Sequence, residues 1–97
     1  MIMVILHYPA LKPTLRELRD DKERSIPFFE NEIPGLIDKT WGINEATGRG
    51  ASVYHFEDMA SADAWFNSKI QTSFREKNQA TLEIFDVAAV AFKRPLK

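Results

Sequence analysis

The fold of this chain is decided by the segment Ile33-Pro34-Gly35-Leu36-Ile37-Asp38-Lys39-Thr40-Trp41 and by the later segment Val53-Tyr54-His55-Phe56-Glu57-Asp58-Met59-Ala60-Ser61-Ala62. Pro34-Gly35 ends a helix, because proline cannot continue one and glycine readily adopts the backbone conformation that follows it. An apolar and aromatic strand comes next, and the second segment contains another strand and the start of a new helix. These elements form the middle of a β-α-β-β-α-β chain.

The residues before this segment predict a strand and an interrupted helix. Residues 3–8 are rich in aliphatic side chains, which favours a strand. Thr14 and Glu17 have the spacing of a capped helix start. An amphipathic helix is predicted because side chains recur every three or four residues, with one imperfect position, at Leu15, Leu18, Lys22, Ile26, Phe29 and Ile33. Pro27 lies inside this pattern and predicts a kink or two helical pieces.

The next two strands are predicted to form a hairpin. The second strand extends from Leu36 to Ile43 and the third from Ala51 to Phe56. Residues 44–48 between them are turn formers, and Gly48 can supply a positive φ angle at no steric cost. The two strands are therefore expected to be antiparallel neighbours.

A second helix and a last strand complete the predicted domain. Ser61 is expected to cap a helix that runs from Ala62 to Asn78. The apolar stripe of this helix consists of Ala62, Trp65, Phe66, Ile70 and Phe74. The last strand is predicted from Thr81 to Phe92. The chain is therefore expected to be a single α+β domain over residues 1–97, with a four-stranded antiparallel sheet.

Composition excludes several classes of function. The 97 residues include 44% hydrophobic and 28% charged side chains, typical of a globular domain. A net charge of −1 gives no electrostatic basis for binding nucleic acid or an acidic membrane. The absence of cysteine excludes disulfides and thiolate nucleophiles. No run approaches the roughly 20 apolar residues of a membrane span, and no signal segment is recognisable, so a cytoplasmic location is expected.

The strands are apolar on both faces, which bears on assembly. Residues 4–6 and 87–92 are apolar at odd and even positions alike. A sheet with one face in water would instead alternate apolar and polar side chains. Because two amphipathic helices cover only one face of a four-stranded sheet, the other face is expected to pack against a second copy of the chain. A homodimer is therefore predicted.

The order of elements resembles the ferredoxin-like dimeric α+β barrel superfamily and, within it, the YdhR-like group of proposed monooxygenases. The matching residues are Pro34, Gly35, Leu36, Lys39, Trp41, Gly50, Tyr54, Phe56, Glu57, Asp58, Ala60, Ser61 and Ala62. This resemblance implies a homodimeric βαββαβ barrel with a pocket between sheet and helices for a small aromatic ligand. It also implies oxidation of phenol-like or polycyclic substrates by O₂ without metal or organic cofactor, since some barrels of this kind act in this way.

Such a reaction needs an apolar cavity and a polar group to hold or deprotonate a phenolic hydroxyl. His7 and Tyr54 are the candidate catalytic residues, because histidine suits a base near neutral pH and a buried tyrosine hydroxyl needs a partner. The candidate substrate-binding residues are Trp41, His55, Trp65, Phe66 and Phe74. Each also has a structural interpretation, with the aromatic rings in the core and the histidines in ordinary hydrogen bonds. Tyr54 and His55 are adjacent on a strand and are expected on opposite faces.

Other classes of function find less support in the residues. Two histidines on strands do not make a metal site, and the haem-degrading relatives use a helical histidine that this chain lacks. An RNA-recognition module would carry stacking rings where the third strand has Ala51 and Val53. No metal, cofactor, nucleic-acid or membrane partner is therefore expected. A barrel that binds a small ligand without any reaction remains the alternative to an enzyme, since the pocket residues are alike in both.

Overall fold

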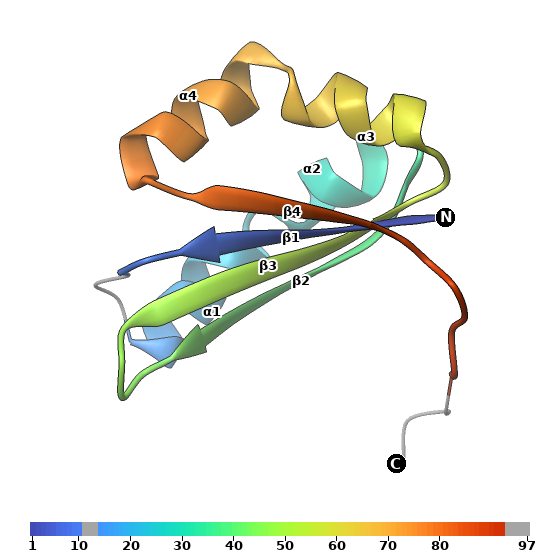
Figure 1. Cartoon of the computed structure of the whole chain (residues 1–97). Helices are drawn as coiled ribbons and strands as arrows, with labels where there is room; N and C mark the ends of the chain where they lie inside the picture. Colours follow the sequence, from blue (N-terminus) through green and yellow to red (C-terminus); the bar gives the residue numbers. More distant parts are fainter. Residues whose placement is uncertain (11–13, 93–97) are drawn as a thin grey trace.

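The computed structural model describes residues 1–10 and 14–92, which form a four-stranded antiparallel sheet and four helices (Figure 1). The strand order across the sheet is β2-β3-β1-β4. In chain order the elements are β1 (Ile2–Tyr8), α1 (Leu15–Glu23), α2 (Ile26–Asn31), β2 (Leu36–Asn44), β3 (Arg49–Phe56), α3 (Met59–Phe66), α4 (Lys69–Asn78) and β4 (Thr81–Asp86). The predicted ferredoxin-like α+β fold is confirmed, with each helical segment divided in two.

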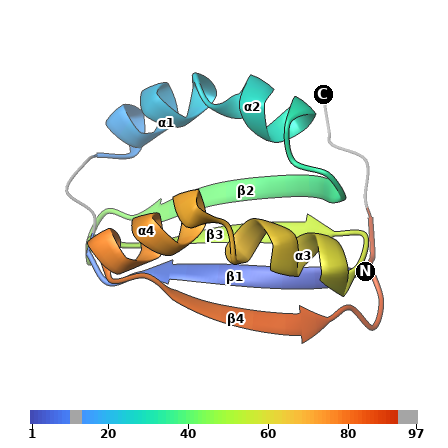
Figure 2. The ribbon, with the colours of Figure 1, turned by 90° about the horizontal axis from the view of Figure 1, so that it is seen from above.

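The helices cover one face of the sheet in two pairs. Figure 2 shows α3 and α4 lying over the central strands β3 and β1, while α1 and α2 run beside β2. The division of the first pair agrees with the prediction made from Pro27, which lies in the first turn of α2. α1 begins as expected, because the Thr14 side chain accepts a hydrogen bond of 3.2 Å from the backbone N–H of Glu17.

The core lies between this face and the helices. β1 alternates strictly, with Ile2, Val4, Leu6 and Tyr8 buried and the residues between them half-buried. β3 adds the fully buried side chains of Ser52, Tyr54 and Phe56 to the same layer. Ile33, after α2, and Ala62 and Phe66, in α3, pack on it from the helical side. One face of the sheet is therefore packed to the density of a protein interior.

The other face of the sheet has no helix over it in the described residues. Half-buried Met3, Ile5 and Val53 form its centre, and Phe85 of β4, 39% exposed, extends it. Ile5 is the direct cross-strand neighbour of Val53, so these side chains form a continuous apolar strip. The two-sided apolar character predicted for residues 4–6 is present in β1, whereas residues 87–92 form no strand. The homodimer remains a prediction.

The two segments that decide the fold pack directly on each other. β2 and β3 are paired, and the backbone N–H of Glu57 donates a hydrogen bond of 2.8 Å to the carbonyl of Gly35. Gly35 has a φ angle of +77°, and a Cβ there would collide with the side chain of Ser61. Glycine is thus required both for the turn after α2 and for the close approach of α3.

The second helical segment differs from its prediction at its start and its middle. Asp58, not Ser61, is the N-cap, and its carboxylate accepts a hydrogen bond of 2.8 Å from the Ser61 N–H. The helix also breaks at Asn67, because Ser68 caps a new helix, α4, through the N–H of Gln71. Ile70, expected in the apolar stripe, is 67% exposed. No helix in the described residues is long and apolar enough to cross a membrane.

The last strand is shorter than predicted, since β4 ends at Asp86 and residues 87–92 form no strand. β4 pairs with β1, which begins at Ile2 directly opposite Asp86. One further hydrogen bond of 3.0 Å joins the Val87 N–H to the Met1 carbonyl, and residues 88–92 have no strand partner in the described residues. Apolar composition alone does not make a strand where a hydrogen-bonding neighbour is missing.

Candidate functional site

An aromatic cavity of about 400 Å³ lies between the covered face of the sheet and the two helical pairs. Its volume is within the range of about 300–1,000 Å³ that is usual for small-molecule sites. Six aromatic side chains line most of it together with Tyr54: Tyr8, Phe28, Phe29, Trp41, Trp65 and Phe74. The polar lining consists of Lys22, Arg24, Ser25, Lys39 and Gln71. The cavity has the composition of a site for a flat aromatic molecule with a polar end.

A bulge in β2 determines which side chains reach this cavity. The pairing with β3 skips one residue, because Leu36 lies opposite Phe56 whereas Asp38 lies opposite His55. An extra residue reverses the alternation of a strand beyond it. Leu36, which packs against the core, therefore shares its face of the sheet with Lys39 and not with Asp38.

Lys39 is held in a cage of aromatic rings. Its Nζ atom lies 3.7 Å from the centroid of the Phe29 ring, 4.5 Å from that of Tyr54 and 4.6 Å from that of Trp41. Burial, and to a smaller extent the charge of Lys22, lowers the pKa of Lys39 to about 7. The ring faces attract the ammonium form and oppose this shift. Lys39 therefore exchanges a proton close to neutral pH.

Two polar atoms at the cavity lack hydrogen-bond partners among the described residues. They are the hydroxyl of Tyr54 and the indole Nε1 of Trp65, both fully buried and without a hydrogen bond of good geometry. The Trp65 indole and the Gln71 side chain nevertheless lie near the Tyr54 hydroxyl and lower its pKa slightly, against the larger effect of burial. Burial raises the pKa of Tyr54 far above its usual value, so this hydroxyl stays protonated and can donate. A buried polar group without a partner costs about 1–3 kcal/mol. A ligand with an acceptor atom would reach these groups only by displacing the side chains that cover them.

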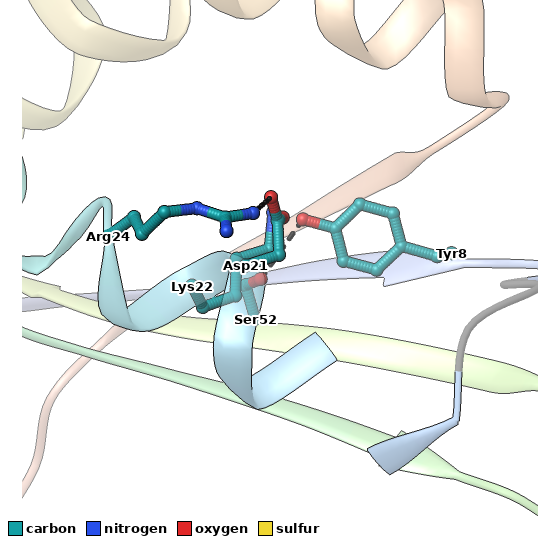
Figure 3. A network of polar contacts seen from close by, with 5 residues as sticks. All are labelled: Tyr8, Asp21, Lys22, Arg24 and Ser52. Atoms are coloured by element: carbon teal, nitrogen blue, oxygen red, sulfur yellow. Dashed lines mark hydrogen bonds and ion pairs between the residues drawn. The ribbon is translucent and has the colours of Figure 1, made fainter. Parts of the chain in front are cut away.

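Tyr8 differs from Tyr54, because its hydroxyl is already satisfied. It shares a buried hydrogen bond of 3.0 Å with the Ser52 Oγ (Figure 3). Burial raises the pKa of Tyr8, and this hydrogen bond offsets part of the rise. Figure 3 also shows Asp21 between Lys22 and Arg24, at distances of 3.4 and 3.3 Å. Both cations lower the pKa of Asp21, which keeps it ionised.

The structure gathers some of the predicted site residues and separates others. Tyr54, Trp41, Trp65 and Phe74 all line the aromatic cavity. Phe66 does not line it; its ring is 3% exposed and packs edge to face on Tyr54, with centroids 4.9 Å apart. Phe66 is thus a core residue, which was the structural alternative to its predicted role in substrate binding.

The two histidines lie on the opposite, uncovered face of the sheet. His55 Nδ1 lies 2.7 Å from the Asp38 carboxylate, and His7 Nε2 lies 2.7 Å from that of Glu83. His7 borders a different hollow of about 500 Å³ at the end of the sheet, near Arg49 and Gln79. Tyr8 is the one Phe, Tyr or Trp side chain among the residues that line that hollow. The hollow therefore lacks the aromatic enclosure that the predicted chemistry requires. As predicted, Tyr54 and His55 point to opposite faces.

Sequence reasoning missed all five polar residues of the cavity lining: Lys22, Arg24, Ser25, Lys39 and Gln71. Lys39 drew notice only as part of the family resemblance, although its spacing of two residues from Trp41 places both on one face of a strand. Gln71 is 4% exposed, which a polar side chain in a helix does not suggest. The bulge at Ile37 could not be read from the residue pattern.

Solved structures with a similar fold include two oxygenases. A monooxygenase from the gene ActVA-Orf6 of Streptomyces coelicolor, solved with the ligand nanaomycin D, has a TM-score of 0.67 at 12% identity over 96% of this chain and 92% of that chain. The cofactor-independent oxygenase SnoaB of Streptomyces nogalater has a TM-score of 0.64 at 10% identity over 92% and 94%. Rv0793 of Mycobacterium tuberculosis has a TM-score of 0.67 at 11% identity over 94% and 98%. Identities this low indicate a common fold alone.

Sequence comparison carries the assignment further than the fold does. No curated protein is significantly similar to this chain in sequence. The family described as "Putative mono-oxygenase ydhR" matches residues 11–93. The matched part contains β2, β3 and both helical pairs, and therefore nearly all of the aromatic cavity. Because the match extends over most of the 97 residues, the chain belongs to the ydhR family.

Proposed function

We propose that this protein is a cofactor-independent monooxygenase that oxidises a small phenolic or polycyclic aromatic substrate with O₂ in the aromatic cavity. The observation that carries the proposal is a cavity walled by aromatic rings at which the Tyr54 hydroxyl, the Trp65 Nε1 and the Gln71 side chain lie close together, with no well-formed hydrogen bond to Tyr54 or Trp65. The family description and the oxygenases that share the fold support the same class of reaction.

The proposed chemistry takes its electrons from the substrate. A phenol loses its hydroxyl proton, and the electron-rich phenolate ring gives four electrons in all to O₂. One oxygen atom forms a new carbonyl on the ring, giving a quinone, and the other leaves as water, so that phenol plus O₂ equals quinone plus water. The protein must bind the ring, favour the phenolate and keep bulk water away from it.

The cavity residues divide these tasks. The Tyr54 hydroxyl, kept protonated by burial, donates a hydrogen bond to the substrate oxygen, and the Trp65 N–H is placed to donate a second. The neutral amine of Lys39, whose pKa is about 7, is the base that accepts the phenolic proton. Trp41 and Phe74 enclose the ring. His7 has no part in this proposal, because it lies on the other face of the sheet.

Oxygen consumption tests the proposal. The wild-type protein, stripped with a metal chelator, is expected to consume O₂ and form quinone from at least one member of a panel of naphthols and hydroxylated anthrones. Tyr54→Phe should lower the rate at least tenfold, since removal of one oxyanion donor costs roughly 10²–10³ in other enzymes. Lys77→Met, on the exposed side of α4, is the matched control and should leave the rate unchanged.

A barrel that binds its ligand without a reaction would behave differently in the same assay. It would bind the aromatic compounds, with quenching of Trp41 and Trp65 fluorescence, and consume no O₂ above the uncatalysed rate. That outcome, or an unchanged rate in Tyr54→Phe, would overturn the proposed reaction. Quinone formation that stops after chelation would show that a metal carries the chemistry.

We also propose that two copies of the chain associate through the uncovered face of the sheet. The apolar strip of Met3, Ile5, Val53 and Phe85 supports this, because that face has no helical cover in the described residues. Sedimentation equilibrium over a range of concentrations tests it. A chain that remains monomeric at high concentration would contradict the proposal.

A further inference from the structure

The aromatic cavity is lined by cations and by no carboxylate. Lys22 and Arg24, at the end of α1, and Lys39, on β2, contribute three basic side chains to the lining. Asp21, an exposed side chain, pairs with Lys22 and Arg24 (Figure 3). The excess of positive charge therefore lies on the side of the cavity where β2 meets the end of α1.

Lys39 is the charge that the fold satisfies least. Among the described residues no carboxylate forms an ion pair with it, and its three ring contacts are the attractive interactions recorded for its ammonium group. Lys22 is close enough to repel it. Two like charges in a partly desolvated space raise the free energy of the empty cavity.

The remaining polar groups of the cavity are also mostly donors. Lysine, arginine and the tryptophan N–H have no acceptor atom at all. The Tyr54 hydroxyl donates, and the Gln71 carbonyl oxygen already accepts from Arg75 at 3.4 Å. Arg75 adds a fourth positive charge behind the Phe66 ring, 5.8 Å from its centroid. A neutral ligand would leave Lys39 without an anionic partner, whereas an anionic oxygen would pair with it.

We infer that the cavity selects aromatic ligands that carry an anionic oxygen on the ring, either a phenolate or a carboxylate, and that Lys39 and Lys22 are the specificity residues. The inference rests on the proposed function only in using the same cavity. The ring of the ligand stacks within Phe29, Trp41 and Trp65, and its anionic oxygen lies on the Lys39 side. The source of the selectivity is the partly desolvated Lys39 ammonium, which has ring contacts but no carboxylate partner among the described residues, with a smaller contribution from its repulsion by Lys22.

Binding of a nitronaphthol dye under nitrogen tests this inference without turnover. The probe is 4-nitro-1-naphthol, whose phenolate absorbs visible light more strongly and at longer wavelength than its neutral form. Its methyl ether, which has the same rings and cannot ionise, is the matched probe. At a pH where the free dye is mostly neutral, wild-type protein should bring up the phenolate band. It should also bind the dye at least tenfold more tightly than the ether, by fluorescence quenching.

Variants separate the charge from the shape of the cavity. Lys39→Met should abolish the phenolate band and bring the two affinities within about twofold, and Lys22→Met should weaken the preference in part. Lys77→Met is the control for a general loss of positive charge and should behave as wild type. Circular dichroism and thermal melting confirm that each variant is folded, and Lys22→Met decides the question if Lys39→Met does not fold.

Three outcomes would overturn the inference. They are equal affinity of the wild type for dye and ether, binding of the dye without its phenolate band, and no binding of either probe or of their one-ring counterparts, 4-nitrophenol and 4-nitroanisole. None of them decides the proposed reaction, since oxygen consumption with naphthols is measured separately. Conversely, selective phenolate binding without oxygen consumption would support the inferred selectivity and contradict the proposed oxygenase reaction.

Discussion

The two faces of the sheet carry different kinds of ionisable group. The covered face holds Lys39 in a cage of rings and the Tyr54 hydroxyl without a partner. The uncovered face holds His7 and His55, each already paired with a carboxylate on a neighbouring strand. By residue type alone the histidines are the better acid–base candidates. Their partners and their position give them a structural explanation, whereas the groups on the covered face are left unsatisfied by the fold.

Unsatisfied groups are informative because folding normally eliminates them. More than nine in ten buried polar groups find a partner, so an orphan beside a cavity suggests one that arrives with a ligand. The uncovered face has the opposite character, since its polar groups are paired and its apolar strip is exposed. The covered face therefore offers a site for a small molecule, and the uncovered face offers a surface for another protein chain.

The largest expected effect concerns the core of the covered face. Phe66→Ala should lower the free energy of unfolding by about 3–5 kcal/mol, because a buried ring is replaced by a cavity. Phe92→Ala is the matched control, since Phe92 is 83% exposed, and should change stability by less than about 0.5 kcal/mol. Urea unfolding followed by fluorescence measures both. A loss below 1 kcal/mol for Phe66→Ala would place its ring at the edge of the cavity and not in the core.

The next effect tests the uncovered face. Ile5→Lys places a charge at the centre of the apolar strip, opposite Val53, and should weaken self-association at least a hundredfold, equivalent to about 2.7 kcal/mol. Sedimentation equilibrium measures the dissociation constant, and circular dichroism checks that the monomer remains folded. Lys77→Met again serves as the control. Unchanged association would move the interface to another surface.

A smaller effect compares the two tyrosines of the covered face. Tyr8→Phe breaks the hydrogen bond to buried Ser52 and should cost about 1–2 kcal/mol of stability. Tyr54→Phe removes a hydroxyl that has no partner, so stability should stay the same or rise by up to about 1 kcal/mol. Urea unfolding of the two variants without ligand makes the comparison. Equal losses would mean that the Tyr54 hydroxyl has a partner in the free protein.

Much of the fold followed from sequence because its signals are local. Pro27, Thr14, Pro34-Gly35 and Gly48 act within one or two turns of the chain, and the breaks and turns they predict are present. The predicted end of β4 was wrong because the length of β4 depends on its pairing with β1, a strand far away in sequence. The second helix was wrong at its cap because Asp58 and Ser61 both suit an N-cap, and tertiary packing decided between them.

The site was less predictable than the fold, for a related reason. Aromatic residues identified three of the cavity walls, Trp41, Trp65 and Phe74, since large rings gather wherever a core or pocket forms. The face on which each polar side chain lies depends on strand register, and the bulge at Ile37 changes that register within β2. The bulge places Lys39 in the cavity and Asp38 beside His55 on the other face. No residue type in β2 predicts that bulge.

The pH dependence of stability tests the environment of Lys39. Its folded pKa of about 7 is below its unfolded value of about 10.5, so between these pH values the unfolded chain binds a proton that the folded chain does not. Stability should therefore rise with pH in this window, by about 1–2 kcal/mol from pH 7 to pH 9 after allowance for the opposing ring contacts.

Lys39→Met should remove this rise and give a flat profile, which urea unfolding at several pH values would detect. The window is kept below pH 10 because Tyr8 and Tyr54 have raised pKa values and would lower stability above it. Lys77→Met should retain the wild-type profile. A wild-type profile that is flat from pH 7 to pH 9 would mean that the ring cage fully compensates for the burial of the amine.

The smallest effect concerns the histidines. In a Val53→Lys background, where the uncovered face is in water and the new charge is not opposite Glu83, His7→Gln should change the free energy of unfolding by less than about 0.5 kcal/mol, since partly exposed ion pairs contribute little. The His7 and Glu83 side chains are 40% and 56% exposed. In the wild-type background the same substitution should cost more if a second chain covers the pair and excludes water from it. Urea unfolding at one protein concentration measures the cost of His7→Gln in both backgrounds. The difference between the two costs reports how far a partner chain excludes water from the His7–Glu83 pair. Equal small costs would mean that the pair stays in contact with water, and that any partner chain packs on the apolar strip alone.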